Sequence, residues 1–180
     1  MSTFILSPLA FLTMTAAIPV ALAWEYPLIK NHGPVEPLPD AAMQFDKAMV
    51  YSVVFDITKK AEDNAKVNPA LDHVARFVNL LALSGIKAQP GNIVAVLHGK
   101  AAPAVLQSTI YKEKLGSENP NLPLLSMLRN AGVKIYVCGQ TLAEQKLAPA
   151  VVHPDVIIAF SAIAVTATCQ LKGYAYLPEK

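Results

Sequence analysis

From residue 48 to the end of the chain, five short apolar segments alternate with segments that carry helix signals. The apolar segments are residues 49–57, 92–98, 133–138, 155–160 and 174–177. The second of them, Asn-Ile-Val-Ala-Val-Leu-His, is apolar at nearly every position, which indicates a strand covered on both faces. Strands and helices that alternate in this way form parallel sheets with right-handed crossovers. The sequence therefore predicts the α/β class, as a three-layer α/β/α domain around a five-stranded parallel sheet.

Capping residues mark the predicted helices between these strands. Asn68-Pro69 is typical of a helix start, with Asn as the N-cap and Pro at the first helical position, and Gly85 is typical of a helix end. Thr141 and Glu144 have the spacing of a capping box, which predicts a short helix from Thr141 to about residue 147. Further helices are predicted over residues 101–115, 122–131 and 161–171.

The first 23 residues contain no Lys, Arg, Asp or Glu and end in Ala21-Leu22-Ala23, a small-x-small cleavage pattern. This pattern predicts a secretory signal peptide over residues 1–23, although the segment lacks the Lys or Arg that usually precedes the apolar region. An uncleaved membrane anchor is the alternative, which Pro8 and Pro19 disfavour. The protein is therefore expected to be periplasmic or secreted, with no membrane span after signal cleavage.

The segment that follows the predicted signal peptide is punctuated by proline. Residues 24–47 contain four prolines and little hydrophobic periodicity. They predict a proline-rich N-terminal arm that lies over the domain or over a neighbouring subunit. Residues 48–180 then form the α/β domain.

Composition and missing motifs exclude several classes of protein. Hydrophobic residues make up 53% of the chain and charged residues 16%, which excludes a disordered chain. The net charge of +2, without a run of basic residues, gives no support for nucleic-acid binding. No glycine-rich phosphate loop and no Gly-x-Ser-x-Gly occurs, so nucleotide binding and serine hydrolysis have no support. The Cys and His residues lack the spacing of a zinc site, so neither a metal nor a cofactor is predicted.

Polar residues follow the predicted strands where each strand ends. In an open parallel sheet, ligands bind at the carboxyl ends of the strands, and consecutive strands are usually neighbours. His98 and Cys138 end consecutive strands, so an imidazole and a thiol are expected to face one crevice, with these two as the candidate catalytic residues. The alternative for His98 is a histidine that hydrogen-bonds a loop. The candidate ligand-binding residues at the same edge are Asp56, Gly99, Gly139, Gln140 and Thr141.

Cys138 is the candidate nucleophile because it precedes the predicted start of a helix. Unpaired N–H groups and the helix dipole at that end favour negative charge, which lowers the pKa of a cysteine and populates its thiolate. The alternative is a small apolar residue that closes a buried strand, since free cysteines are among the most buried residue types. The spacing alone leaves both readings open.

The second cysteine, Cys169, is predicted to lie about 12 Å down the helix over residues 161–171, too far from Cys138 for a disulfide. Both thiols are therefore expected to be free, with Cys169 a core residue. The stretch 156–171 has no charged residue but is shorter than the ~20 residues of a membrane span. A helix this apolar indicates a subunit interface, with a well-covered core helix as the alternative.

Three short motifs together resemble the DsrE/DsrF-like family. They are Val-Ala-Val-Leu-His-Gly at 94–99, Ala-Gly-Val-Lys-Ile-Tyr-Val-Cys-Gly-Gln at 131–140 and Gln-Leu-Lys-Gly-Tyr-Ala-Tyr-Leu at 170–177. The resemblance covers residues 48 to 177 and implies a five-stranded parallel sheet in a homotrimer or homohexamer. Family members studied for function pass sulfur as a cysteine persulfide between partner proteins. Cys138 and the pair His98-Gly99 match positions of the family pattern, which implies a sulfur donor or acceptor protein as partner.

The sequence leads to more than one functional hypothesis. The first is an exported, oligomeric DsrE-like protein in which Cys138 binds or transfers sulfane sulfur. The second is a non-catalytic small-ligand-binding or structural oligomeric module in which Cys138 is unreactive. A Cys–His hydrolase is a third, although no residue that would orient His98 can be named from the sequence. Whether the protein is an enzyme stays open at this point.

Overall fold

The computed structural model describes residues 23–180, so the predicted signal peptide lies outside the described residues except for Ala23. The strands and helices follow in the predicted order. The strands are β1 (Val53–Ile57), β2 (Ile93–Leu97), β3 (Lys134–Cys138), β4 (Ile157–Ala159) and β5 (Ala175–Glu179). The helices are α1 (Pro69–Leu83), α2 (Ser108–Leu115), α3 (Leu122–Asn130), α4 (Gly139–Glu144) and α5 (Ala162–Leu171), with 3-10 helices at Gly99–Val105 and Pro149–Val151.

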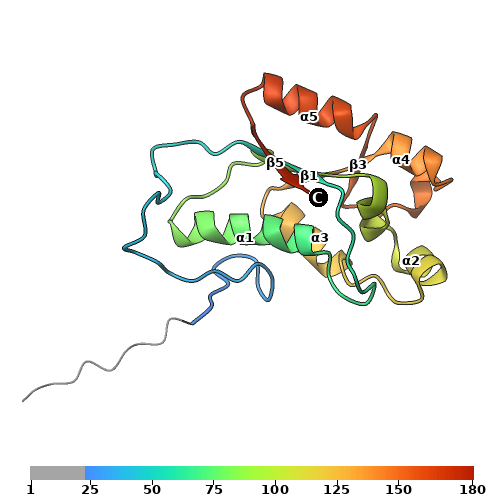
Figure 1. Ribbon diagram of the computed structural model, residues 1–180, viewed down its shortest axis with the longest axis horizontal. Helices are drawn as coiled ribbons and strands as arrows, with labels where there is room; N and C mark the ends of the chain where they lie inside the picture. Colours follow the sequence, from blue (N-terminus) through green and yellow to red (C-terminus); the bar gives the residue numbers. More distant parts are fainter. Residues whose placement is uncertain (1–22) are drawn as a thin grey trace, which may run out of the picture.

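The five strands form one sheet in the order β4-β3-β2-β1-β5, and every neighbouring pair is parallel. The sheet lies between α1 and α3 on one side and α5 on the other (Figure 1). The prediction of a three-layer α/β/α domain with a five-stranded parallel sheet is therefore confirmed. Cys138 ends β3 and His98 follows β2, and these two strands pair with each other, as expected.

The two faces of the sheet carry different cores. On the side of α1 and α3, alternate residues such as Phe55, Leu97 and Ile135 belong to the main hydrophobic cluster. On the side of α5, a smaller cluster joins Cys138 to four other buried residues, Val54, Val94, Val96 and Ala162. Since side chains alternate along a strand, Asp56 in β1 lies on the same face as Val54, which is the face of α5.

Two local predictions differ in outcome. Asn68 caps α1 as predicted, because its side-chain oxygen accepts a hydrogen bond from Ala70 N–H at 2.9 Å. The predicted continuous helix over 101–115 is wrong: the chain forms a 3-10 helix, becomes extended at Leu106 and starts α2 at Ser108. Pro103 within this stretch lacks an N–H, and Leu106 forms an antiparallel bridge with Val152, so the chain turns instead of continuing as a helix.

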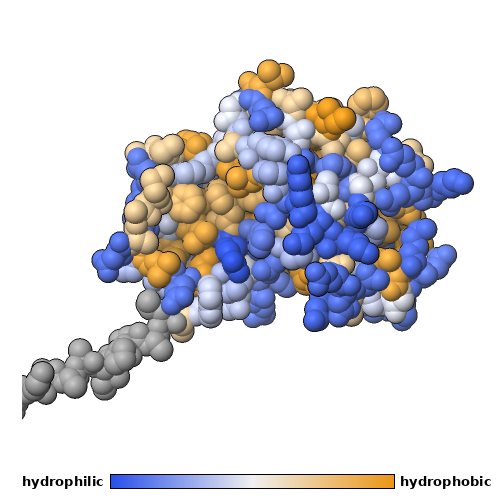
Figure 2. Space-filling view, in the orientation of Figure 1, coloured by the Kyte–Doolittle hydropathy of each residue, from blue (hydrophilic) through white to orange (hydrophobic). Residues whose placement is uncertain are grey.

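Helix α5 forms as predicted, with the Ser161 hydroxyl accepting from Ala164 N–H at 3.0 Å. Within the single chain, however, it is not a core helix, because Ile163 is 79% exposed and Leu171 90% exposed. Cys169 is half-buried and therefore not a core residue, which corrects the prediction. Figure 2 shows apolar side chains gathered over the top of the molecule, where Figure 1 places α5. Among residues 23–180, no helix combines the length and the apolarity that a bilayer crossing requires.

Residues 24–47 lie against α1 (Figure 1). Ile29 and Val35 of this segment are buried, and Ile29 belongs to the main core. Asn79 of α1 holds the backbone of the segment: its side-chain oxygen accepts from the N–H groups of Leu28 and Ile29 at 3.0 and 2.7 Å. Its amide nitrogen donates to the carbonyl oxygens of Ile29, His32 and Gly33.

Candidate functional site

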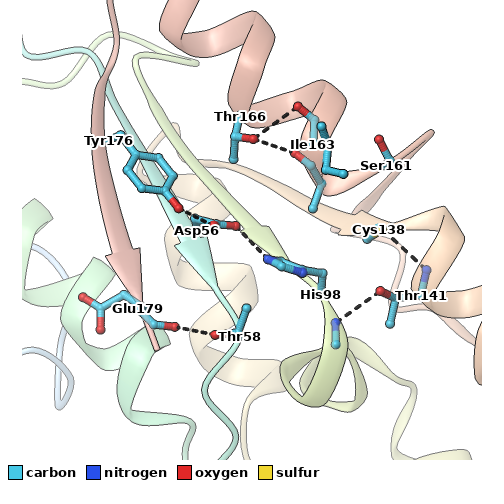
Figure 3. Close-up of polar contacts among 12 residues, drawn as sticks. Asp56, Thr58, His98, Cys138, Thr141, Ser161, Ile163, Thr166, Tyr176 and Glu179 are labelled. Carbon is cyan, nitrogen blue, oxygen red and sulfur yellow. Dashed lines mark hydrogen bonds and ion pairs between the residues drawn. The ribbon is translucent and has the colours of Figure 1, made fainter.

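Four neighbouring strands each bring one polar side chain to the α5 side of the sheet. Cys138 ends β3, His98 follows β2, Asp56 belongs to β1, and Tyr176 comes from β5 (Figure 3). A cavity of about 350 Å³ lies at this edge. Its wall includes six of the seven predicted site residues, namely Asp56, His98, Gly99, Cys138, Gln140 and Thr141. The first turns of α5 close the other side with Ser161, Ala162, Ile163 and Thr166.

Cys138 itself is the N-cap of α4. Its sulfur accepts a hydrogen bond from Thr141 N–H at 3.5 Å, and the helix begins at Gly139. The predicted capping box is therefore wrong: Thr141 lies inside the helix, and its hydroxyl accepts from Gly99 N–H at 3.2 Å instead. Strand β3 ends at Cys138 and α4 begins at the next residue, so Cys138 occupies the N-cap position and its thiol is the capping group. Sequence motifs missed this cap because sulfur is a weak acceptor and cysteine is not among the preferred N-cap residues.

The surroundings of Cys138 favour its thiolate. Burial raises the pKa of the thiol, but hydrogen bonding from the N–H and hydroxyl of Thr141 and from the N–H groups of Ala162 and Gln140 lowers it by more. The pKa of Cys138 therefore lies below its ordinary value. Gln140 and Ala162 belong to the first turns of two different helices, α4 and α5, so both helix N-termini act on one sulfur.

Glycine is required next to the thiol because backbones approach closely there. A Cβ atom at Gly139 would lie 2.7 Å from the carbonyl oxygen of Ala159 in β4. Gly99 has a φ of +53°, in the left-handed region, and this conformation directs its N–H to Thr141. The side chain of Gln140 donates to the carbonyl oxygen of Phe160 at 3.2 Å, so the Gln140 group that acts on the sulfur is its backbone N–H and not its amide.

Asp56 joins His98 and Tyr176 in a hydrogen-bonded row. One carboxylate oxygen lies 2.8 Å from His98 Nε2, and the other accepts from the Tyr176 hydroxyl at 2.6 Å (Figure 3). This hydrogen bond to a carboxylate raises the pKa of Tyr176, and partial burial and the negative charge of Asp56 act in the same direction. Tyr176 was not among the predicted site residues, because no local pattern in the sequence says that β5 pairs with β1.

The row also provides the residue that orients His98, which the sequence alone could not name. A Cys–His hydrolase would need the imidazole bonded to the thiol. The Cys138 sulfur accepts from main-chain N–H groups, that of Thr141 at 3.5 Å among them, whereas His98 Nε2 pairs with Asp56. The thiol of Cys138 is therefore activated by main-chain N–H groups, and the imidazole of His98 is bonded to the carboxylate of Asp56 and not to the thiol. No cluster of three or more His, Cys, Asp or Glu side chains suited to a metal ion occurs in the described part of the chain, residues 23–180.

Residues 49–178 match the model of a protein family described as the DsrE/DsrF-like family. The chain belongs to the DsrE/DsrF-like family. The matched range contains Asp56, His98, Cys138 and Tyr176, so the whole site lies within the family domain. The resemblance seen in the three sequence motifs is thereby confirmed.

Solved structures show the same DsrE-like fold. The chain is similar to MTH1491 from Methanobacterium thermoautotrophicum, a protein of unknown function, with a TM-score of 0.54 and 19% identity. It is also similar to the ychN protein from E. coli, with a TM-score of 0.51 and 14% identity. Each alignment covers 71% of this chain and 98% of the other chain. At these identities the similarity establishes the fold alone. No curated protein matches the sequence.

Proposed function

We propose that this DsrE/DsrF-like protein is exported and that Cys138 binds and transfers sulfane sulfur as a persulfide. The observation that carries the proposal is the environment of the thiol. Its pKa is lowered by N–H groups of two helices, and it lines a cavity at the carboxyl edge of the sheet. The thiolate is the nucleophilic form of cysteine, so this environment favours attack on a sulfane sulfur atom. Membership of a family associated with sulfur relay agrees with this chemistry.

Each candidate residue has a role in this proposal. The Cys138 thiolate attacks the outer sulfur of a donor and keeps that sulfur as Cys138–S–SH. The N–H groups of Gln140, Thr141 and Ala162 stabilise the anionic sulfur, and Gly99 holds the Thr141 hydroxyl in place. His98, in the wall of the same cavity, serves proton transfer.

Export and assembly belong to the same proposal. The uncharged segment over residues 1–23 supports secretion, so the sulfur donor or acceptor would be outside the cytoplasm. The exposed apolar residues of α5 support a homo-oligomer, which we expect to be a trimer or hexamer as the family resemblance implies.

The first test measures sulfur uptake on each cysteine separately. The mature protein, purified without reductant, is incubated with a polysulfide or persulfide donor and analysed by intact and peptide mass spectrometry. We expect a gain of about 32 Da, one sulfur atom, on Cys138. Cys138→Ser should abolish the gain, whereas Cys169→Ser, the matched control, should keep it.

Two outcomes contradict the sulfur-carrier proposal. One is uptake that persists at full yield in Cys138→Ser, and the other is a Cys138 that gains no sulfur from any donor. The second result would favour the non-catalytic module, in which the cavity holds a small ligand and the nearly buried Cys138, 5% exposed, is a wall residue.

A further inference from the structure

The carboxylate of Asp56 is shared between two donors and fixes the ring of His98. Its side chain is only 15% exposed, and its two oxygens are bound to His98 Nε2 and to the Tyr176 hydroxyl at 2.8 and 2.6 Å. Because an ionised carboxylate only accepts hydrogen bonds, Nε2 carries a proton, and Nδ1 is the nitrogen that exchanges a proton.

The charges around the cavity select the kind of donor. The wall contains two carboxylates, Asp56 and Glu144, and neither Lys nor Arg occurs among its lining residues. The remaining wall comes mainly from small polar side chains and from Ile163. A dianion such as thiosulfate would meet these two carboxylates, and no Lys or Arg of the wall would bind it, while His98 is already paired with Asp56. A small persulfide that reacts as R–S–SH and whose organic group is neutral or cationic avoids this repulsion.

We propose that His98, held by Asp56 and Tyr176, is the general acid that protonates the thiolate released when a small alkyl persulfide gives its outer sulfur to Cys138. This inference rests on the proposed function. It assigns Asp56 and Tyr176 as positioning residues and names the donor class. An alkyl thiolate is a strong base and a poor leaving group, so a proton donor at this point accelerates the transfer.

The transfer step is balanced without an outside oxidant or reductant. The Cys138 thiolate attacks the outer sulfur of R–S–SH, and a new sulfur–sulfur bond forms at Cys138 while the donor's sulfur–sulfur bond breaks. The released R–S⁻ keeps the electron pair of the broken bond and takes the proton from His98 Nδ1. Cys138 released one proton to solvent when its thiol ionised, and His98 takes one proton back from solvent after the transfer. The sum is Cys138–SH plus R–S–SH giving Cys138–S–SH plus R–SH.

The test compares two donors whose organic groups carry no charge and which differ in the basicity of the thiolate they release. One is the persulfide of mercaptoethanol, an alkyl thiol, and the other is an aryl persulfide, whose thiolate leaves without protonation. We expect Asp56→Asn to slow the alkyl reaction by about 100-fold. The same variant should slow the aryl reaction by less than about threefold, because a weakly basic leaving group needs no acid. His98→Gln should show the same contrast, and Tyr176→Phe a smaller one in the same direction.

Matched controls separate this effect from damage to the fold. The controls are Asp40→Asn and Tyr174→Phe. Asp40 lies in the exposed arm, and the hydroxyl of Tyr174 donates to the carbonyl oxygen of Gly91, away from the cavity. Both variants should react as the wild type does with both donors. Thiosulfate should transfer sulfur at least about tenfold more slowly than the alkyl persulfide, after each donor is normalised to its rate with free cysteine.

The outcomes distinguish the two proposals. Equal losses with both donors in Asp56→Asn, or no loss with either, would overturn the role of the row while leaving Cys138 as a sulfur carrier. A wild-type Cys138 that accepts sulfur from neither persulfide would overturn the proposed function itself. Thermal unfolding first establishes that each variant is folded; if Asp56→Asn is unfolded, His98→Gln is compared instead, and equal losses with both donors in that folded variant overturn the role of the row.

Discussion

The two cysteines of the described chain lie in opposite chemical environments. Main-chain N–H groups at the starts of α4 and α5 lower the pKa of Cys138 despite its burial. Burial raises the pKa of Cys169, and the nearby charge of Lys172 offsets that effect only in part. Cys138, which the sequence predicts as the nucleophile from its place at a strand end, is therefore also the cysteine whose thiolate the fold stabilises. Cys169 is the internal control in the same protein.

The rate of alkylation against pH should separate the two thiols. We expect a midpoint below about 8.5, the usual pKa of a free cysteine, for Cys138 and above it for Cys169. A lowered pKa in the folded state also stabilises the fold as pH rises. The stability difference between wild type and Cys138→Ser should therefore be fully present above the unfolded pKa and be lost as pH falls through the folded pKa.

Residue-resolved mass spectrometry of a pH series with iodoacetamide measures both midpoints in one sample, and urea unfolding at several pH values measures the stability difference. A Cys138 midpoint equal to or above that of Cys169 would contradict the assignment of Cys138 as the activated thiol.

At the scale of elements, α1 carries the segment that precedes the domain. The side chain of Asn79 is fully buried and forms five hydrogen bonds to backbone groups between Leu28 and Gly33. Gly33 approaches α1 so closely that a Cβ atom there would lie 2.1 Å from the nitrogen of Arg76. Asn79 therefore supplies most of the side-chain hydrogen bonds that hold this irregular segment on α1, and Asp72 of the same helix adds one to the N–H of Gly33.

Asn79→Ala should release this segment. Loss of the amide leaves several buried backbone groups without partners, and we expect the free energy of unfolding to fall by about 3 kcal/mol. Limited proteolysis should cut within residues 24–47 faster than in the wild type. Asn130→Ala, at the exposed end of α3, is the control and should change neither quantity. Unchanged proteolysis in Asn79→Ala would show that the apolar contacts of Ile29 and Val35 suffice.

At the scale of the whole molecule, the two faces of the sheet are covered unequally. Two helices, α1 and α3, cover one face, and α5 alone covers the other (Figure 1). Four large apolar residues are exposed on the α5 side: Ile157 of β4, Ile163 and Leu171 of α5, and Tyr176 of β5. Exposed apolar patches often mark interaction sites, so this side is the candidate interface between copies of the chain. Because Ile163 also lines the cavity, a second copy on this face would lie close to Cys138.

Leu171→Glu should weaken self-association without unfolding the chain. Leu171 is 90% exposed in the single chain, so a charge there costs the monomer little, but it would be desolvated in an interface. We expect the dissociation constant to rise by about 100-fold, measured by light scattering after size-exclusion chromatography across a concentration series. Met43→Glu, at a 99% exposed position of the arm, is the control. A wild type that is monomeric at all concentrations would contradict the expectation.

Local patterns in the sequence predicted most elements of this protein, with residues 101–115, where a 3-10 helix and α2 replace one predicted helix, as the exception. Hydrophobic runs predicted the five strands, Asn68-Pro69 predicted the start of α1, and the strand ends led to Asp56, His98 and Cys138. These features are encoded by residues a few positions apart, so backbone propensity, capping and periodicity suffice to find them. The parallel sheet followed from their alternation, and family membership followed from short motifs at two of the strand ends and around β5.

Only the tertiary structure decided how distant residues meet. The order β3-β2-β1-β5 brings Tyr176 to Asp56, 120 residues away in sequence, and so completes the row that holds His98. Contact between Gly139 and the backbone of β4 helps to bring the N-terminus of α5 to the thiol of Cys138. Strand pairing and helix docking depend on burial summed over the whole chain, so no local pattern contains them. The sequence determined which groups lie at the edge of the sheet, and the packing of the complete chain determined which of them act on one another.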